Sequence, residues 1–361
     1  MKHFIQTSLF ILLANPIFNN AHAEPTFSCC ATDESYVGRP DEHAPISIMG
    51  DHTHAKGSFM ASYRYMRMDM DGMRQGTDRI SSSEVFAEGF VVTPESMTMD
   101  MHMLGFMYGF SEKLTLTLMS NYTELEMDHS VAQMAAGMIN NGSTEFTTEA
   151  SGIGDTRIGG LYRFFLEESQ KAHFGLSFSL PTGSIDEKDR TPGPGGPDNR
   201  LLPAAMQLGS GTVDLLPSVT YVKQLESATL GLQANAVIRL EDENSNGYRF
   251  GNRFGLTTWG GYNLSDWVGL NLGLNYTYTG ELRGDQDGVT PDTGRTVNTA
   301  FGENYGGERI DSILGVNLYI PQGVLKNHRL AIDVRLPLWQ DLNGVQLETD
   351  STLTLGWQAA F

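Results

Sequence analysis

Cysteine is almost missing from this sequence of 361 residues, since the only two cysteines are the neighbours Cys29 and Cys30. Adjacent cysteines pair with each other only in a strained ring, because a disulfide needs its two Cα atoms further apart. The scarcity therefore argues against a secreted domain held together by disulfides.

Positive charge and long apolar runs are also scarce. Lys and Arg number 24 against 43 Asp and Glu, so the net charge is −19 and nucleic acid is not an expected partner. No run of 18 apolar residues occurs and the mean hydropathy is −0.25, which excludes a transmembrane helix. The chain also lacks a Walker loop, an H-E-x-x-H and a G-x-S-x-G motif. We therefore predict no enzyme activity and no cofactor.

The N-terminus has the layout of a secretory signal peptide. A basic start precedes an apolar stretch, and Ala21-His22-Ala23 forms an A-x-A cleavage site before Glu24. The sequence thus predicts a signal peptide over residues 1–23. Residues 24–56 are expected to form a periplasmic segment that precedes the main domain.

Apolar and polar residues alternate with a period of two along much of the chain after residue 57. This period is typical of β-strands, whose successive side chains point to opposite faces. Such segments are predicted at 57–70, 97–110, 113–126, 151–166, 171–184, 206–224, 228–241, 248–263, 267–281, 308–321, 327–340 and 347–361.

The pattern predicts an all-β fold, a transmembrane antiparallel up-and-down β-barrel of about twelve strands over residues 57–361. A soluble sandwich hides its apolar face between two sheets, whereas a membrane barrel turns that face toward lipid. Several segments reach the roughly 9–11 residues that a tilted span needs. Short turns alternate with long connections at 71–96, 127–150, 185–205 and 282–307, as expected of a bacterial outer-membrane barrel surrounded by lipid and lipopolysaccharide.

The chain stops on an aromatic residue, Phe361, after a segment that alternates apolar residues. Such an ending resembles the assembly signal of bacterial outer-membrane barrels. The barrel-assembly machinery is therefore an expected partner of this last strand.

Three motifs resemble an outer-membrane family named after the meta pathway of phenol degradation. They are GIGDTRIGGLYRF from Gly152, LSFSLPTGS from Leu176 and LGSGTVDLLPSVTY from Leu208. The resemblance implies a transporter-like outer-membrane barrel and leaves the substrate open. The Met-rich start, residues 49–74, resembles a subgroup associated with heavy-metal or copper resistance. From this we expect an outer-membrane channel or transport component for small solutes.

Methionines at every second position mark the first two predicted strands. Arg64 should face the lumen, because a lipid-facing arginine costs about 2–4 kcal/mol at the midplane, and the methionines of its face then line the lumen with it. If Met70 lies opposite Met97, the methionines of both strands share the inner face. Thioethers are soft ligands that select Cu(I), so this ladder either handles a soft metal ion or is a flexible packing surface. Its members are Met66, Met68, Met70, Met97, Met99, Met101 and Met103.

A second metal candidate precedes the barrel. His52 and His54 stand two residues apart and can chelate a metal ion from an extended segment. Their spacing matches no closed zinc motif, which favours the alternative of a polar periplasmic tail in which the histidines have no such role.

Charged residues of both signs are predicted to line the lumen. Opposite charges can pair across the lumen and partly fill it, or only stiffen the wall. Because neither sign is in excess, the sequence predicts no preference for anions or cations. The residues are Arg64, Asp155, Arg157, Arg163, Asp214, Arg239, Arg253, Asp311, Asp333 and Arg335.

Two other function classes are compatible with a barrel. A structural or adhesive surface protein could bind divalent ions through acidic external loops. An outer-membrane lipase needs a serine beside a histidine, and His129-Ser130 is the only adjacent His-Ser pair. We place this pair in the predicted loop 127–150.

Overall fold

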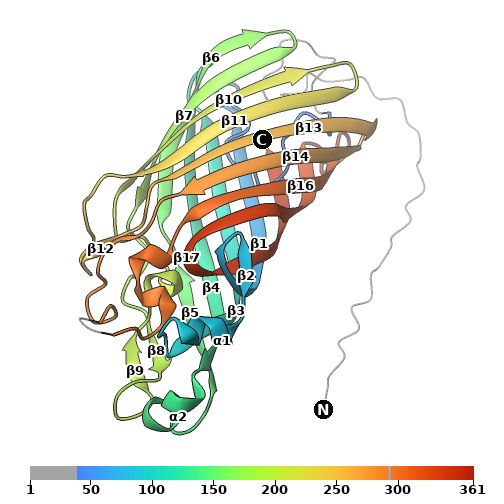
Figure 1. The fold of residues 1–361 in the computed structure, drawn as a ribbon. Helices are drawn as coiled ribbons and strands as arrows, with labels where there is room; N and C mark the ends of the chain where they lie inside the picture. The colour runs from blue at the N-terminus through green and yellow to red at the C-terminus, as the bar shows by residue number, and fades with distance from the viewer. Residues whose placement is uncertain (1–38, 292–293) are drawn as a thin grey trace.

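The computed structural model describes residues 39–291 and 294–361, and shows a closed antiparallel β-barrel (Figure 1). The predicted signal peptide, Cys29 and Cys30 lie outside the described residues. The first barrel strand pairs with the last, so the sheet has no open edge around the wall. The predicted fold class is therefore confirmed.

Eleven strand elements make up the closed wall, and each pairs with its neighbours in chain order. Two further strands extend the wall outside this circle: β2 (Asp78–Ile80) pairs with β1, and β5 (Glu145–Ile153) pairs with β4. The wall strands are β1 (Phe59–Gly76), β3 (Val92–Gly109), β4 (Leu114–Val131), β6 (Thr156–Glu167), β7 (Gln170–Leu180), β10 (Asp214–Gln224), β11 (Ala228–Arg239), β13 (Arg253–Ser265), β14 (Val268–Thr279), β16 (Gly307–Ile320) and β17 (His328–Ala360).

The last element, β17, is 33 residues long and turns back on itself. Its first half pairs with β16 and its second half with β1. The reversal lies near Asn343-Gly344, where Gly344 has a φ of +54°, a left-handed conformation that glycine adopts readily in a tight turn. The Trp357 indole donates to His328 Nδ1 at 3.0 Å across the two halves. The eleven elements thus supply twelve crossings of the wall, as the sequence predicts.

The wall is apolar outside and polar inside. Along β14, Leu272 is 63% exposed on the outer face, whereas Asn271 and Asn275 are 5% and 4% exposed on the inner face. This arrangement is the inverse of a soluble sandwich and fits a surface surrounded by lipid.

Helices are few and short. The α-helices are α1 (Ser82–Ala87) and α2 (Gln133–Ile139), and the 3₁₀ helices are η2 (Ala204–Met206), η3 (Asn298–Ala300) and η4 (Gly302–Asn304). Among the described residues, no helix has both the length and the hydropathy needed to span a bilayer.

The long connections are folded and gather at one end of the barrel. Both α-helices and the hairpin of β8 (Lys188–Thr191) and β9 (Asp198–Leu201) lie at the lower end of Figure 1. A smaller pair, β12 (Tyr248–Arg249) with β15 (Arg283–Gly284), joins two other connections. Several strands are longer than predicted, because β1, β3 and β4 continue their pairing into segments that we expected to be loops.

Residues 39–56, hereafter the plug, lie inside the barrel. The expected separation of segment 24–56 from the barrel therefore does not hold for the described part of that segment. Asp41, His52 and His54 of the plug are all at most 3% exposed. The wall is shaped to receive the plug: a Cβ at Gly109 of β3 would lie 1.8 Å from the carbonyl oxygen of Ala55, so only glycine fits there.

Candidate functional site

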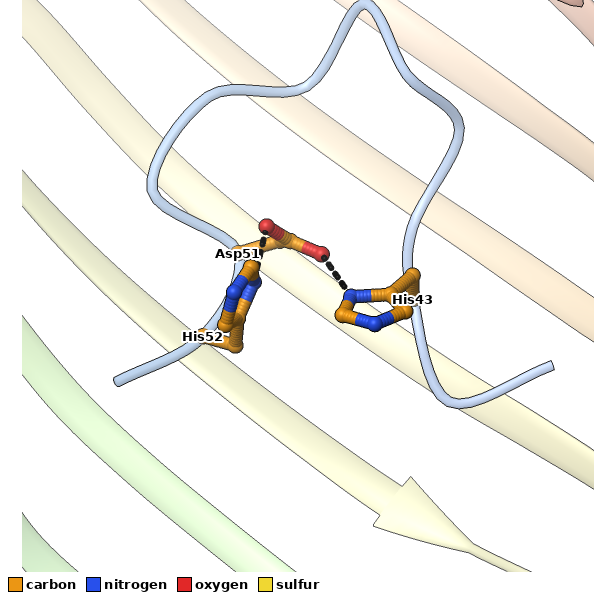
Figure 2. Close-up of side chains that lie close together, drawn as sticks. All are labelled: His43, Asp51 and His52. Carbon is orange, nitrogen blue, oxygen red and sulfur yellow. Dashed lines mark hydrogen bonds and ion pairs between the residues drawn. The ribbon is translucent and has the colours of Figure 1, made fainter. Parts of the chain in front are cut away.

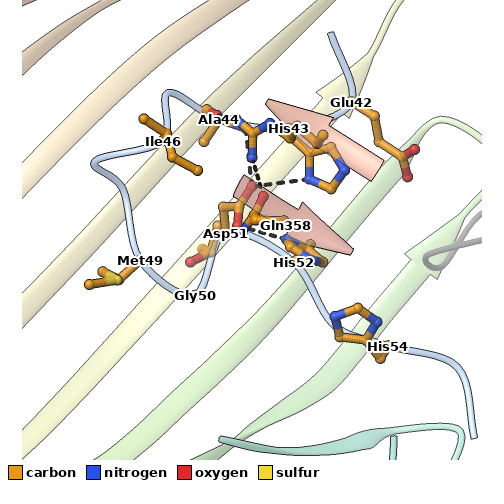
Figure 3. Close-up of polar contacts among 12 residues, drawn as sticks. Glu42, His43, Ala44, Ile46, Met49, Gly50, Asp51, His52, His54 and Gln358 are labelled. Atoms are coloured by element: carbon orange, nitrogen blue, oxygen red, sulfur yellow. Dashed lines mark hydrogen bonds and ion pairs between the residues drawn. The ribbon is translucent and has the colours of Figure 1, made fainter. Parts of the chain in front are cut away.

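Arg329 of β17 is the central anchor of the plug. Only 3% exposed, it donates to the carbonyl oxygen of Ala44 at 2.5 Å. It also donates to Asn317 Oδ1 at 2.6 Å and to Gln358 Oε1 at 2.7 Å, both on the wall. A buried guanidinium needs several such acceptors. Arg329 therefore links the plug to β16 and to both halves of β17, and Figure 3 shows Gln358 beside the plug.

Other wall strands hold the plug through its backbone. His173 of β7 hydrogen-bonds with the carbonyl oxygen of Gly50 at 2.8 Å, and Gln233 of β11 donates to that of Met49 at 2.9 Å. Asp333 of β17 accepts from the Ser47 backbone at 2.8 Å. Buried backbone groups need such partners, and here side chains supply them in place of a β-ladder. The plug is thus bound like a peptide ligand.

A compact cluster of His43, Asp51 and His52 lies in the plug (Figure 2). Asp51 Oδ1 lies 2.7 Å from His52 Nδ1, and Asp51 Oδ2 lies 3.7 Å from His43 Nδ1. One potential ligand atom from each residue falls within 4.8 Å of the others. The ring of His54 follows, with its centroid 4.9 Å from that of His52.

Burial controls the protonation of this cluster. Desolvation lowers the pKa of His43 to about 3 and that of His54 to about 2. Burial acts to raise the pKa of Asp51, but attraction to His52 and hydrogen bonds from His43 and His52 hold it well below its usual range. Neutral imidazole and ionised carboxylate are the forms that ligate metals. Two imidazoles and one carboxylate form a ligand set typical of zinc and similar ions.

A cavity of about 310 Å³ lies between the plug and the wall. Four of its lining residues are arginines, Arg64, Arg157, Arg253 and Arg335, and none is acidic. Amide and hydroxyl side chains of β11, β13 and β14 line other parts of the cavity. The cavity is therefore a chamber lined by arginine, amide and hydroxyl groups together with apolar side chains, and residues 47–50 of the plug close it on one side.

The predicted lumenal charges face inward, and several of them pair with a near neighbour. Arg239 pairs with Asp214 on the adjacent strand, and Arg309 pairs with Asp311 two residues along β16 at 2.9 Å. Arg163 lies at the turn end of β6 and donates to the Glu112 carbonyl oxygen. The charges thus do not bridge the lumen as pairs; what lies in the lumen is the plug.

The methionines of β1 and β3 meet in the register that parity suggests. Met66 pairs with Met101, Met68 with Met99 and Met70 with Met97. At the outer end, Met70, Met97 and Met99 pack against an apolar cluster that includes Leu202 and Met206 of the loop. Met103, also on the inner face, is 7% exposed.

The methionine pairs and the histidine cluster are separate sites. His54 contacts Thr115 of β4, whereas Met101 pairs with Thr123 of the same strand. These β4 residues are about 26 Å apart at roughly 3.3 Å per residue. The structure therefore does not bring the predicted histidine and methionine ligands together.

The alternative catalytic pair is not assembled. His129 and Ser130 are neighbours in β4 instead of in a loop, so their side chains point to opposite faces. The His129 ring stacks on Phe146, with centroids 4.5 Å apart and 7° between the planes.

Arg329 was missed in the sequence. Arg329 lies an even number of residues from Asp333 and Arg335 along the strand, so the sequence predicts that it also points inward. Its role could not be predicted, because nothing in the sequence shows that the plug lies against it.

A protein-family model described as "Putative MetA-pathway of phenol degradation" matches residues 86–306. The chain belongs to this family. The match confirms the resemblance seen in the three sequence motifs, which all fall within the matched range.

The three family motifs converge in the structure on Asp155, which belongs to the first of them. Asp155 Oδ1 accepts from the Gly183 backbone of the second motif at 3.0 Å. Its Oδ2 accepts from the backbone and hydroxyl of Ser210 in the third motif, at 2.9 and 2.8 Å. In this family member the motifs therefore tie β6 to the two segments that follow β7.

Solved structures support the fold. An outer-membrane channel from Pseudomonas putida F1 has a TM-score of 0.58 at 18% identity, over 88% of this chain and 100% of that one. A Pseudomonas aeruginosa FadL homologue (10% identity; 92% and 99% covered) and the Pseudomonas putida toluene transporter TodX (10%; 92% and 94%) both have TM-scores of 0.41, too low to carry an argument. No curated protein matches the sequence significantly.

Proposed function

We propose that this protein is an outer-membrane channel or transport component that conducts small solutes through the barrel, with the plug as its gate. The observation that carries the proposal is a polar chamber inside a lipid-facing wall, closed by a segment held through side-chain hydrogen bonds. Such bonds can open without breaking a strand pair. The fold similarity to an outer-membrane channel supports this view.

The location and partners follow from the same surface. We infer that residues 1–23 are removed on export and that the apolar outer face of the wall contacts outer-membrane lipid and lipopolysaccharide. Phe361 closes the barrel by exchanging backbone hydrogen bonds with Phe59 at 2.7 and 3.0 Å, and its side chain stays 68% exposed. An exposed terminal aromatic supports recognition of the last strand by the barrel-assembly machinery.

Replacing Arg329 by Met is expected to increase channel opening about tenfold. Methionine keeps much of the side-chain volume but removes the charged donor to the Ala44 carbonyl, a hydrogen bond worth roughly 1.5–3 kcal/mol, and each 1.4 kcal/mol is tenfold in an equilibrium. Open time in planar bilayers and small-solute flux into proteoliposomes measure the effect. The matched control is Arg190→Met on the exposed β8 hairpin. Absence of current from both the wild type and Arg329→Met would reject a channel function.

A second candidate function is the handling of a soft or transition metal ion, favoured by the cross-strand methionine pairs and by the cluster of His43, Asp51 and His52. The pairs place thioethers from two strands face to face on the lumenal side, as a Cu(I) path requires. The cluster offers a separate nitrogen and oxygen ligand set. In this candidate function, Cu(I) is an ion that the protein binds or transports.

Replacing Met66, Met68, Met99 and Met101 together by Leu tests the methionine path. Leucine keeps size and apolarity but removes sulfur, so we expect loss of Cu(I) binding with the barrel still folded. Competition with a chromophoric Cu(I) chelator measures the binding. The control is Met134→Leu with Met138→Leu, both exposed on α2. Equal Cu(I) binding by the two variants would assign the pairs to packing alone.

A further inference from the structure

We propose that the cavity beside the plug is a binding chamber for a small organic anion, a carboxylate with an apolar body. This inference rests on the proposed transport function and names the class of solute. It starts from Arg64, Arg157, Arg253 and Arg335, which reach the cavity from β1, β6, β13 and β17 with no acidic residue among the lining.

Two of these arginines donate hydrogen bonds to acceptors in the plug. Arg64 Nε donates to the carbonyl oxygen of Ile46 at 3.0 Å, and Arg335 Nε donates to the Ser47 hydroxyl at 3.1 Å. Each uses one of its five N–H groups in this way. The remaining donors of the fork are available to the chamber.

The other two arginines are the strongest indication of a ligand. Arg157 and Arg253 belong to inward-facing positions, yet both are exposed, and they are therefore exposed to the lumen. Within residues 39–291 and 294–361, no side-chain hydrogen bond or ion pair satisfies either guanidinium. Both guanidinium groups are therefore free to donate to an anion that enters the cavity.

The neighbouring carboxylates are already engaged. Asp155 accepts from Gly183 and Ser210, Asp214 pairs with Arg239, and Asp311 pairs with Arg309. Asp333 accepts from the Ser47 backbone. Asp214 and Asp311 are thus paired with arginines that do not line the cavity. Asp155 and Asp333 bond to neutral donors and keep their charge, but none of the four carboxylates lines the cavity itself.

Repulsion among the arginines strengthens the case. The positive charges of Arg157, Arg309 and Arg335 repel Arg253, and the negative charge of Asp311 attracts it. Between low-dielectric walls such repulsion is weakly screened. A carboxylate placed between Arg157 and Arg253 would accept from both, and guanidinium forks match the two oxygens of a carboxylate.

The rest of the lining indicates an apolar body on the anion. Met60, Met107 and Leu161 form a buried apolar cluster at one side of the same cavity. The volume of about 310 Å³ is at the lower end of the range for ligand sites, roughly 300–1,000 Å³. A short-chain or aromatic monocarboxylate fits this combination of size, charge and apolar contact.

The test compares benzoate with benzamide, a neutral molecule of nearly the same shape, by calorimetry on the purified full-length protein. We expect benzoate to bind roughly tenfold or more tightly than benzamide. The double variant Arg157→Gln with Arg253→Gln should reduce benzoate affinity to that of benzamide, whereas the exposed control Arg283→Gln should leave it unchanged. Equal binding of the two probes by the wild type, or full benzoate affinity in the double variant, would overturn the proposal.

Flux measurements separate this proposal from the transport function. If benzoate binds selectively but no solute enters proteoliposomes, the binding chamber holds and the channel function fails. If solutes enter without regard to charge and benzoate shows no preference, the channel holds and the anion chamber fails. Reversal potentials in a salt gradient add a third readout: the wild type should favour anions, and the double variant should lose that preference.

Discussion

Deleting residues 39–56 is expected to raise single-channel conductance roughly tenfold or more and to hold the channel open, because conduction follows pore diameter and lining. The plug occupies the interior and takes acceptor and donor groups from β7, β11, β16 and β17. Once it is absent, water replaces these contacts. The exposed wall groups are polar, so hydration compensates for their loss of partners.

The deletion should leave the barrel folded. Every strand pairing of the closed wall lies between residues 59 and 360, and none uses the plug. Heat-modifiable mobility on gels checks the fold, and planar-bilayer recording checks the conductance. A folded deletion variant with the conductance of the wild type would show that the plug does not close the path.

Cross-linking the plug to the wall is expected to abolish flux. The Ile46 side chain lies 2.3 Å from where a Cβ on Gly356 of β17 would stand, so cysteines at both positions come within reach of a disulfide after the larger isoleucine is removed. With Cys29→Ser and Cys30→Ser, Ile46→Cys and Gly356→Cys are the only thiols. In the Arg329→Met background, oxidation should reduce solute flux to that of protein-free liposomes.

The effect must reverse on reduction. A thiol reductant cleaves the bond, and flux should return to the value of the Arg329→Met variant. Ile46→Cys alone, in the same background, controls for oxidation without a cross-link. Full flux through a protein whose cross-link is complete by mass spectrometry would mean that the plug can stay in place during conduction.

Arg329→Met and the cross-link between positions 46 and 356 act on the same equilibrium between a bound and a released plug. The first favours the released plug, and the second favours the bound plug. Arg329 reaches the plug from one half of β17, and Gly356 lies on the other half where the wall touches Ile46. Because the side chains that bond to the plug backbone come from separate strands, the position of the plug depends on the closed barrel as a whole. This arrangement couples the state of the plug to the chamber, whose lining includes Ser47 and Gly50.

Much of the barrel could be predicted because its signal is local. Alternation with period two identifies a strand and both of its faces at once, as the leucines and asparagines of β14 illustrate. Arg64 indicates which face of its strand points into the lumen, and Met66 and Met68 lie on that same face. Their observed partners, Met101 and Met99, are the ones that this assignment predicts. The extra length of β1, β3 and β4 was missed, because folded loops prolong pairing where alternation is weaker.

The candidate site was less predictable, because its residues come together only in space. Four arginines from four strands line one chamber, and none of the acids expected to balance them lines it. Asp214 and Asp311 pair with other arginines. The count of charges along the sequence therefore suggested no preference for anions or cations, whereas in the structure only positive side chains line the cavity.

The sequence by itself determined the inside-out barrel, the twelve crossings of its wall and the inward face of each strand, since these follow from residue-to-residue alternation against lipid. Only the tertiary structure decided where the plug lies, because residues 39–56 have no periodic pattern and no strand partner. Their backbone groups are satisfied by side chains up to 286 positions away, such as Asp333 at Ser47. Contacts of that kind join residues far apart in the sequence and leave no local trace in the chain.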